Sequence, residues 1–435
     1  MRTAKLTARP LTCGTRGRSD VSHTGGPGAG RCGTEEDRQV AGRRSGVWLV
    51  AFAFVVTMLG TTLPTPLYPI YQQRFGFSGL TVTVIYALYA VGVVGGLLLF
   101  GSWSDRVGRS LMLVVGLLLS GLSAVAFLFA GGLAMLLAGR LLSGVSVGIF
   151  TGTATAAIVE LAAPGRQRRA SLLAASANTG GLGTGPLLSG VLAQYAPQPV
   201  QLCFLVDLAL LALAAIGFVW IPEPPGAPRG LRPKFQRLRV PAQVRGAFVR
   251  AGIAGFASFA VLGLFVAVCA AFLAQVLHAH NHAVPGLVVF VAFGASSLGQ
   301  VLSTAISERA ALAAGCVGLA AGCAVVAASL LRASLPLVVA GALVCGLSHG
   351  LVFRAGLAMV TAASPPGQRA EVASSFFVTL YIGISLPVIG LGAAGDRYGL
   401  LRSGVAFAVL VGLLALVALA SLPLSAAAGR TRVPR

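Results

Sequence analysis

The sequence predicts an all-α polytopic membrane protein with twelve transmembrane helices in two pseudo-symmetric halves of six. Three observations support this prediction. First, 56% of the 435 residues are hydrophobic and only 10% are charged, so charges are too few to cover a water-facing surface. Second, apolar runs of about 20 residues recur along the chain. Third, a segment of the first half reappears, with a constant offset, in the second half.

The predicted spans are the runs long enough to cross a bilayer, which takes about 17 to 25 mostly apolar residues. They are 47–67, 80–101, 111–130, 133–160, 172–194, 200–221, 251–276, 285–306, 310–331, 335–362, 372–394 and 403–426. Two-residue alternation is absent, so a membrane barrel is not predicted.

The net charge of +21 orients these spans. Of 32 Lys and Arg residues, 26 fall on one side of the predicted membrane, in the N-terminal tail, alternate loops and the C-terminal tail. The positive-inside rule therefore places both termini in the cytoplasm of a multi-pass protein of the plasma or inner membrane. The partner that this charge implies is the lipid bilayer, and no nucleic acid is needed to explain it.

The same map divides the chain. Residues 1–45 lack periodicity and are expected to form a disordered basic tail, although a later start site is an open alternative. Residues 46–221 and 251–426 form the two six-helix halves. The Pro- and Arg-rich segment 222–250 is a cytoplasmic linker, and 427–435 is a short tail.

An internal repeat connects the halves. Residues 133–165 align with 335–367 at a shift of 202, without gaps and with ten identities in 33 positions. Several glycines and a final Pro-Gly match, which apolar composition alone does not explain. Parallel repeats of this kind indicate a transporter that rocks about a site between its halves.

The loop after the second span carries a possible conformational latch. Asp105, Arg106, Gly108 and Arg109 combine a carboxylate, two guanidinium groups and a glycine within one turn. Such a set can form an ion pair across a tight turn. An ordinary basic cytoplasmic loop is the alternative.

Charged or titratable residues inside spans mark functional sites by default. Arg140 lies in the fourth span, Asp207 at similar depth in the sixth, and His349 near the middle of the tenth. Arg140 and Asp207 are a possible buried ion pair, and all three are candidates for proton coupling. A neutral His hydrogen-bonded between helices is the alternative for His349.

Two further groups are predicted to shape the interior. The fifth span contains Gly181, Gly185, Pro186, Ser189 and Gly190, where small residues allow close helix packing and proline frees a carbonyl group. The candidate cavity residues form a polar stripe on the first span together with one arginine of the tenth; they are Thr57, Thr61, Thr65, Tyr68 and Arg354.

These motifs together resemble those of the major facilitator superfamily. The loop Gly101-x-x-x-Asp105-Arg106-x-Gly108-Arg109 is similar to that family's signature, although Ser110 replaces its final basic residue. The resemblance implies that this loop locks the cytoplasmic side, that Arg140 contributes to proton coupling and that the first span lines the cavity. The span-5 pattern resembles that of the family's proton-coupled antiporters, with Ser189-Gly190 in place of Gly-Gly.

The predicted function is a secondary active transporter that works by alternating access as a monomer. The resemblance favours proton-coupled efflux of a small-molecule substrate, drug-like or a metabolite. A proton-coupled importer of a small metabolite is the alternative, and a membrane-embedded enzyme or sensor belongs to a different class. No cofactor and no metal site are expected, since the proton gradient would supply the energy and His278, His280 and His282 lack a carboxylate or Cys partner.

Overall fold

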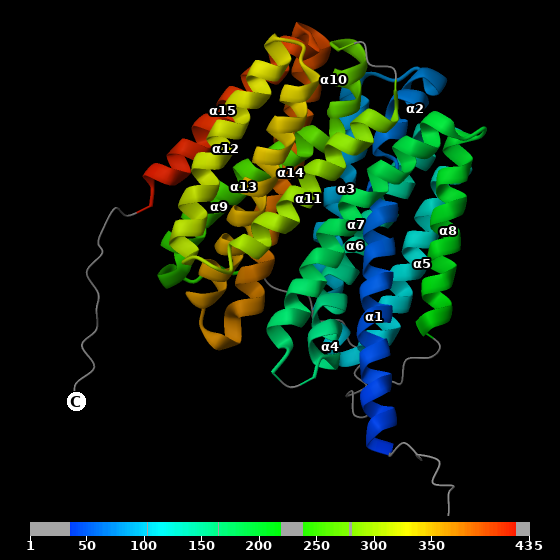
Figure 1. Ribbon diagram of the computed structural model, residues 1–435, viewed down its shortest axis with the longest axis vertical. Helices are drawn as coiled ribbons and strands as arrows, with labels where there is room; N and C mark the ends of the chain where they lie inside the picture. Colours follow the sequence, from blue (N-terminus) through cyan, green and yellow to red (C-terminus); the bar gives the residue numbers. More distant parts are fainter. Residues whose placement is uncertain (1–34, 102, 164, 219–237, 278–280, 423–435) are drawn as a thin grey trace, which may run out of the picture. The chain divides into compact units, whose positions relative to one another are not determined.

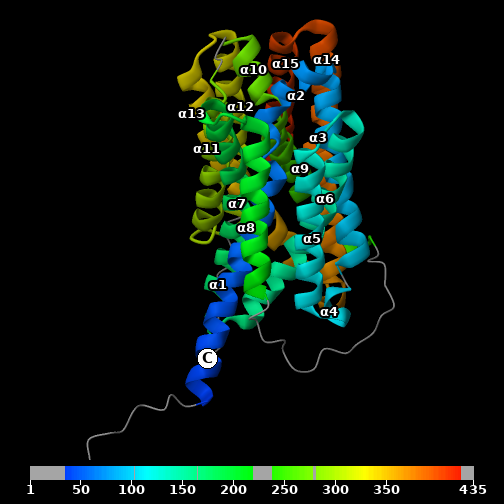
Figure 2. The same cartoon turned by 90° about the vertical axis from the view of Figure 1, so that its right-hand side faces the viewer.

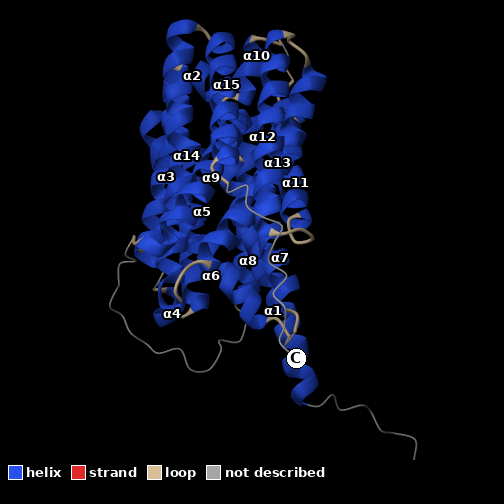
Figure 3. Cartoon of the chain, turned by 90° about the vertical axis from the view of Figure 1, so that its left-hand side faces the viewer, coloured by secondary structure: helices blue, strands red, loops and turns tan. Residues whose placement is uncertain are grey.

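The computed structural model describes residues 35–101, 103–163, 165–218, 238–277 and 281–422. The chain divides into two units, residues 1–40 and 41–435. Of the first unit, the structure describes residues 35–40, which are helical. The second unit contains the membrane helices. Over the described residues the secondary structure consists of helices and their connections, without strands (Figure 3).

The helices follow one another along the chain with short connections (Figure 1). They are α1 (Glu35–Thr62), η1 (Thr65–Leu67), α2 (Tyr68–Phe75), α3 (Gly79–Phe100), α4 (Ser104–Val107), α5 (Arg109–Leu128), α6 (Leu133–Leu161), α7 (Gln167–Tyr195), α8 (Pro199–Phe218), η2 (Ala242–Val244), α9 (Arg245–Ala267), α10 (Cys269–Gln275), α11 (Ala283–Leu302), α12 (Glu308–Leu331), α13 (Leu335–Ala362), η3 (Pro366–Gln368), α14 (Arg369–Tyr398) and α15 (Leu400–Ala420).

The predicted all-α membrane architecture is confirmed, with one helix of unusual composition. Among the described residues, eleven helical segments are long and apolar enough to cross a membrane. The remaining predicted span, 172–194, lies within α7, which has 29 residues. Glycine, Ser, Thr and Asn residues lower the mean hydropathy of this helix. Several of its glycines lie in close contact with neighbouring helices.

Two helices begin within segments that are expected from the sequence to be a tail and a linker. The expected tail 1–45 overlaps α1, which begins at Glu35. The expected linker 222–250 likewise overlaps η2 and the start of α9, so the seventh span begins at least six residues earlier than predicted.

The first and seventh spans are each interrupted towards the same end of the bundle. Prolines at Pro64 and Pro66 explain the break between α1 and α2, since proline cannot donate the backbone hydrogen bond that continues a helix. The break between α9 and α10 falls at Val268, and no proline accounts for it.

The repeat seen in the sequence corresponds to the same helix crossing in both halves. Helix α3 crosses α6, and α11 crosses α13, through backbones that approach each other at glycines. These are Gly92, Gly96, Gly144 and Gly148 in the first crossing, and Gly299, Gly346 and Gly350 in the second. A Cβ atom added at Gly148 would lie 2.6 Å from the carbonyl oxygen of Val93. The close approach therefore requires glycine.

The halves meet along two helix pairs, α3 with α14 and α7 with α11 (Figures 1 and 2). At one pair, the Leu80 amide of α3 donates a 3.1 Å hydrogen bond to Asp396 Oδ2 of α14. At the other, the His282 amide before α11 donates a 2.8 Å bond to Gln194 Oε1 of α7. The two bonds are related by the shift of 202, because Leu80 aligns with His282 and Gln194 aligns with Asp396. This pair of bonds between the halves therefore follows the internal repeat.

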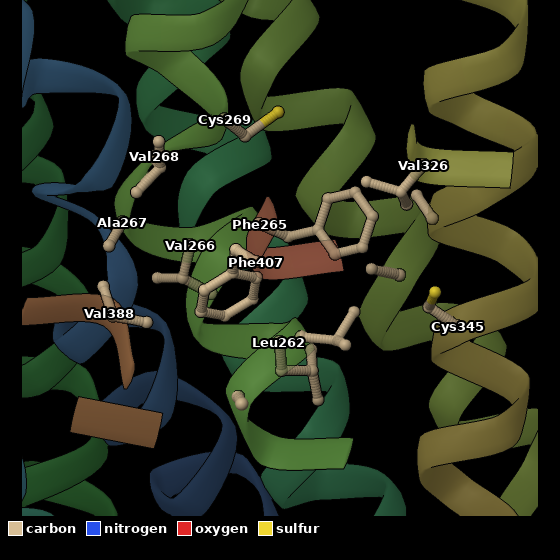
Figure 4. Packing of buried hydrophobic residues seen from close by; sticks show 14 of the residues in the cluster. Leu262, Phe265, Val266, Ala267, Val268, Cys269, Val326, Cys345, Val388 and Phe407 are labelled. Carbon is tan, nitrogen blue, oxygen red and sulfur yellow. The ribbon is translucent and has the colours of Figure 1, made fainter. Parts of the chain in front are cut away.

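The largest apolar core lies mainly in the second half. Side chains of α9 form its centre and pack against α12, α13, α14 and α15. Figure 4 shows Leu262, Phe265 and Val266 of α9 among Val388 and Phe407. This core packs α9 against its neighbours in the second half.

Candidate functional site

A cavity between the two halves brings together several of the polar residues of the interior. Its empty space, counted together with the part that is open to the outside, is about 760 Å³. The first half contributes Thr61, Thr62, Tyr86, Tyr89, Arg140, Thr151, Asn178, Thr179 and Leu182; the second contributes Phe259, Leu262, Val266, Phe293, Gln300, His349, Phe353, Phe377, Tyr381 and Ile384. A lining of apolar and aromatic groups with a few polar ones is typical of small-molecule sites.

Arg140 is the charged residue of this lining. Its side chain is 1% exposed. Its Nε donates to the hydroxyl of Tyr68, and its Nη1 donates to the carbonyl oxygen of Thr61 at 2.5 Å. The guanidinium carbon lies 5.2, 5.9 and 5.7 Å from the ring centroids of Tyr68, Tyr86 and Phe127, respectively. Its Nη2 has no hydrogen-bond partner among the described residues.

Asp207 lies in the interior but does not line the cavity. Its side chain is 2% exposed and packs on the backbone of α1 at Gly60, where an added Cβ would come within 2.6 and 2.8 Å of the two carboxyl oxygens. No described residue bonds to its Oδ1. The predicted ion pair with Arg140 is not formed in this structure, because the two side chains approach adjacent residues of α1 instead of each other.

His349 enters the cavity from the second half. It is 6% exposed, and its Nδ1 shares a 2.8 Å hydrogen bond with the hydroxyl of Ser296 on α11. Its ring centroid lies 4.8 Å from that of Phe259 and 6.0 Å from that of Phe353. The ring is thus fixed by one hydrogen bond and two aromatic contacts.

The polar stripe of α1 divides among several environments. Thr61 lines the cavity, and its hydroxyl donates 3.0 Å to the carbonyl of Thr57. Thr57 is fully buried outside the lining. Thr65 and Tyr68 line a second cavity, towards α10 and α14. Arg354 is half-buried and is not among the residues that line the cavity between the halves.

The span-5 residues hold α7 against two helices. An added Cβ at Gly181 would lie 2.5 Å from the carbonyl oxygen of Val55 on α1, and Gly185 faces α1 at Leu59. Pro186 and Gly190 instead face α11. Ser189 is buried and donates 3.0 Å to the carbonyl of Gly185. The pattern therefore has a visible packing role on both sides of α7.

Pro186 leaves a backbone carbonyl without its usual helical donor. That carbonyl belongs to Leu182, four residues earlier. The hydroxyl of Thr62 on α1 donates to it at 2.8 Å. An unsatisfied carbonyl inside a membrane is costly, so Thr62 compensates for the proline.

The predicted latch is described in part. Gly108 joins α4 to α5 at a φ of 112°, a value that strongly favours glycine. Arg109 forms a two-point ion pair with Glu160 of α6, with Nε–Oε2 and Nη2–Oε1 both at 2.6 Å. The side chains of Asp105 and Arg106 lie outside the described residues, as do His278 and His280 of the loop before α11.

Sequence reasoning missed several residues of the cavity. Asn178, Gln300 and Tyr381 are the clearest, and the Gln300 amide donates 2.9 Å to Thr179 Oγ1 in the other half. An amide side chain inside an apolar span was the available signal for Asn178 and Gln300. Glu160 was also missed, because it lies at the end of its span.

Relatives of known description match parts of the chain. A 185-residue match is 29% identical to the multidrug efflux protein YfmO of Bacillus subtilis (strain 168), covering 41% of this chain and 45% of that protein. A 192-residue match is 27% identical to multidrug resistance protein 1 of the same organism, covering 43% and 49%. The chain therefore matches less than half the length of either relative.

Solved structures share the fold over nearly the whole chain. A bacterial homologue of the human lysosomal transporter Spinster, in an inward-facing and unoccupied conformation, has a TM-score of 0.67 at 18% identity, covering 88% of this chain and 98% of that one. The human organic anion transporter MFSD10 (TETRAN) has a TM-score of 0.63 at 17% identity, covering 88% and 99%. At these identities the likeness concerns the fold alone.

The family comparison covers most of the membrane region. The family model described as Major Facilitator Superfamily matches residues 50–388, from the first span to the eleventh. With the repeated helix crossings and the cavity between the halves, this match shows that the chain belongs to the Major Facilitator Superfamily of multi-pass membrane transporters.

Proposed function

We propose that this transporter exports small drug-like molecules or metabolites in exchange for protons, by alternating access to the cavity between its halves. The observation that carries the proposal is the cavity itself, because both halves contribute to its lining and it contains a buried guanidinium group. Relative rocking of the halves would open it to either side. The names of the Bacillus subtilis relatives support efflux as the direction.

The coupling proton is assigned to Asp207 in this proposal. An ionised carboxylate buried without a cation partner is costly within a membrane, so exchange of a proton accompanies any change in its surroundings. Asp207 packs on Gly60, and the adjacent Thr61 accepts a hydrogen bond from Arg140. Movement of α1 would therefore affect the carboxyl group and the cavity together. His349, which also lies in the cavity, is the second candidate.

The remaining parts of the proposal concern orientation and closure. Both termini lie in the cytoplasm of the plasma or inner membrane, and the protein acts as a monomer. The loop 105–109 is the cytoplasmic latch. Replacing Asp105 by Asn should then reduce transport at least about tenfold while surface expression is retained, because a charge-assisted hydrogen bond is lost. Normal transport by D105N would remove the latch from the proposal.

The experiment is reconstitution in liposomes with an imposed pH gradient and a panel of dyes, antibiotics and sugars. With an acidic lumen, a proton antiporter accumulates substrate inside, whereas a symporter expels it. Asp207→Asn should abolish this gradient-driven accumulation but keep substrate exchange at equal pH. Glu308→Gln, which changes an exposed carboxyl at the start of α12, is the matched control. If D207N retains accumulation and His349→Gln loses it, the proton site is His349.

A further inference from the structure

We infer that the cavity between the halves selects organic anions with a flat aromatic or apolar body, and that Arg140 is the anchor for the anionic group. The inference rests on the proposed role of this cavity as the substrate site. It adds the chemical class of the substrate, which neither the fold nor the family match specifies.

The first step is the charge of the lining. Five acids have side chains that the structure describes; they are Glu160, Asp207, Glu308, Glu371 and Asp396. None of these lines the cavity, whereas Arg140 does. A positive charge in a low-dielectric enclosure attracts an anion and repels a cation more strongly than it would in water. The cavity is therefore electrostatically unsuited to an organic cation.

The second step is the hydrogen-bonding capacity that Arg140 retains. A guanidinium group carries five N–H donors, and Nε and Nη1 are engaged by Tyr68 and Thr61. Nη2 is buried and has no partner among the described residues. A buried unpaired donor of this kind is unfavourable. A carboxylate, sulfonate or phosphate oxygen would satisfy it and neutralise the buried charge.

The third step concerns the walls. Seven aromatic rings from both halves line the cavity: Tyr86, Tyr89, Phe259, Phe293, Phe353, Phe377 and Tyr381. Tyr89 of α3 and Tyr381 of α14 meet across the halves, with ring centroids 6.3 Å apart. Such rings favour stacking or edge contacts with another flat ring. The body of the ligand is thus expected to be aromatic or compactly apolar.

The fourth step concerns the remaining polar groups. Asn178, Thr179, Gln300 and His349 supply amide, hydroxyl and imidazole groups around the lining. These groups can donate and accept, so they tolerate neutral substituents such as hydroxyl or carbonyl groups. They supply no fixed negative charge. Polar substituents are therefore tolerated, while the sign of the ligand charge is set at Arg140.

Binding to purified full-length protein tests the inference without requiring transport. The probes share one ring and differ in charge: naphthalene-2-carboxylate, naphthalene-2-carboxamide and naphthalen-2-ylmethylammonium, supplemented by benzoate and biphenyl-4-carboxylate. Calorimetry at neutral pH should give the tightest binding for a carboxylate. Naphthalene-2-carboxylate should bind about tenfold tighter than the ammonium compound or more. The carboxylate forms a charge-assisted hydrogen bond with Arg140, whereas the ammonium group is repelled by the same positive charge.

Variants then locate the site. Arg140→Gln should weaken carboxylate binding about tenfold or more while leaving carboxamide binding nearly unchanged, and Arg140→Lys should restore part of the preference. Tyr381→Ala should weaken all ring compounds. Arg402→Gln, which removes an exposed arginine at the start of α15, is the matched control and should bind as the unaltered protein does.

Three results would overturn the inference. Two concern the unaltered protein and do not depend on whether R140Q folds: tighter or equal binding of the ammonium compound, or absence of binding by every carboxylate of the series. The third is retention of full carboxylate affinity by a folded R140Q. Selective carboxylate binding without pH-driven flux would refute the proposed coupling and leave the substrate class standing, so the two failures are distinguishable.

Discussion

The two halves of this transporter share their packing but not their buried chemistry. Three glycine pairs that the shift of 202 or 203 relates lie in both the α3–α6 and the α11–α13 crossing; they are Gly96 and Gly299, Gly144 and Gly346, and Gly148 and Gly350. At the same shift, however, Arg140 corresponds to Ala342, Asp207 to Val409 and His349 to Val147. Close packing therefore constrains both copies, whereas each polar group belongs to one half, as expected when a single asymmetric site lies between symmetric walls.

The largest expected effect tests the shared packing. Gly148→Val in the first half and Gly350→Val in the second should each destabilise the protein by about 3 kcal/mol or more, because the new side chain meets backbone atoms that cannot move independently. Thermal unfolding in detergent would measure both. Gly152→Val and Gly294→Val are the matched controls, because both positions are exposed and an added Cβ meets nothing within 4 Å. Equal losses in the controls would show that the crossings are not the sensitive points.

The next prediction, of intermediate size, concerns a hydrogen bond from Thr62 that the first half has and the second half lacks. Pro186 and Pro387 lie in corresponding helices, α7 and α14. Thr62 satisfies the carbonyl freed by Pro186, whereas the residue aligned with Thr62 is Leu264. Thr62→Val should therefore destabilise the protein by about 1 to 2 kcal/mol through loss of a buried hydrogen bond.

The control for this prediction is Thr184→Val on α7. The Thr184 hydroxyl bonds to the carbonyl of Gly181 in its own helix, so its removal leaves the contact between α1 and α7 intact. Unfolding curves of T62V and T184V should differ accordingly. Indistinguishable curves would mean that the Thr62 bond contributes nothing beyond the local environment.

The smallest effect tests the symmetric bonds between the halves. Asp396→Ala and Gln194→Ala should each lower stability by about 1 kcal/mol, as expected for removal of a side chain that accepts from a helix N-terminus. Asp396 carries a full charge and Gln194 does not. The loss of stability in D396A should therefore become smaller at high salt, whereas the loss in Q194A should stay the same. Measurements of both variants at two ionic strengths check this. An identical salt dependence would argue against a charge effect at Asp396.

Several features could be predicted from the residue types and their positions along the chain. Long apolar runs predicted the membrane helices, because the energetic cost of exposing backbone groups to lipid leaves few other solutions. Glycine at Gly108 predicted a turn, and the turn is there. Arg140 and His349 were recognised as interior residues, since a charged or titratable group in an apolar span stands out. The repeated crossing was visible as matched glycines before any helix was placed.

Other features depended on how helices rotate about their axes. Arg140 and Asp207 lie at similar depth, which suggested a pair, but each approaches α1 separately. The stripe of Thr57 to Tyr68 was expected to face one cavity and is divided among several environments. Depth in the membrane is readable from position along the chain. The direction of a side chain around its helix is set by the packing partners.

The sequence by itself determined the membrane helices, the repeat and the presence of isolated polar groups in the interior. These follow from hydrophobicity, chain length and residue size, which are local properties. The tertiary structure alone decided that Arg140, Gln300, His349 and Tyr381 line one cavity and that Asp207 does not. Those placements arise from contacts between different helices, such as Arg140 with Thr61 and Gln300 with Thr179, and such contacts are settled by close packing of the whole bundle.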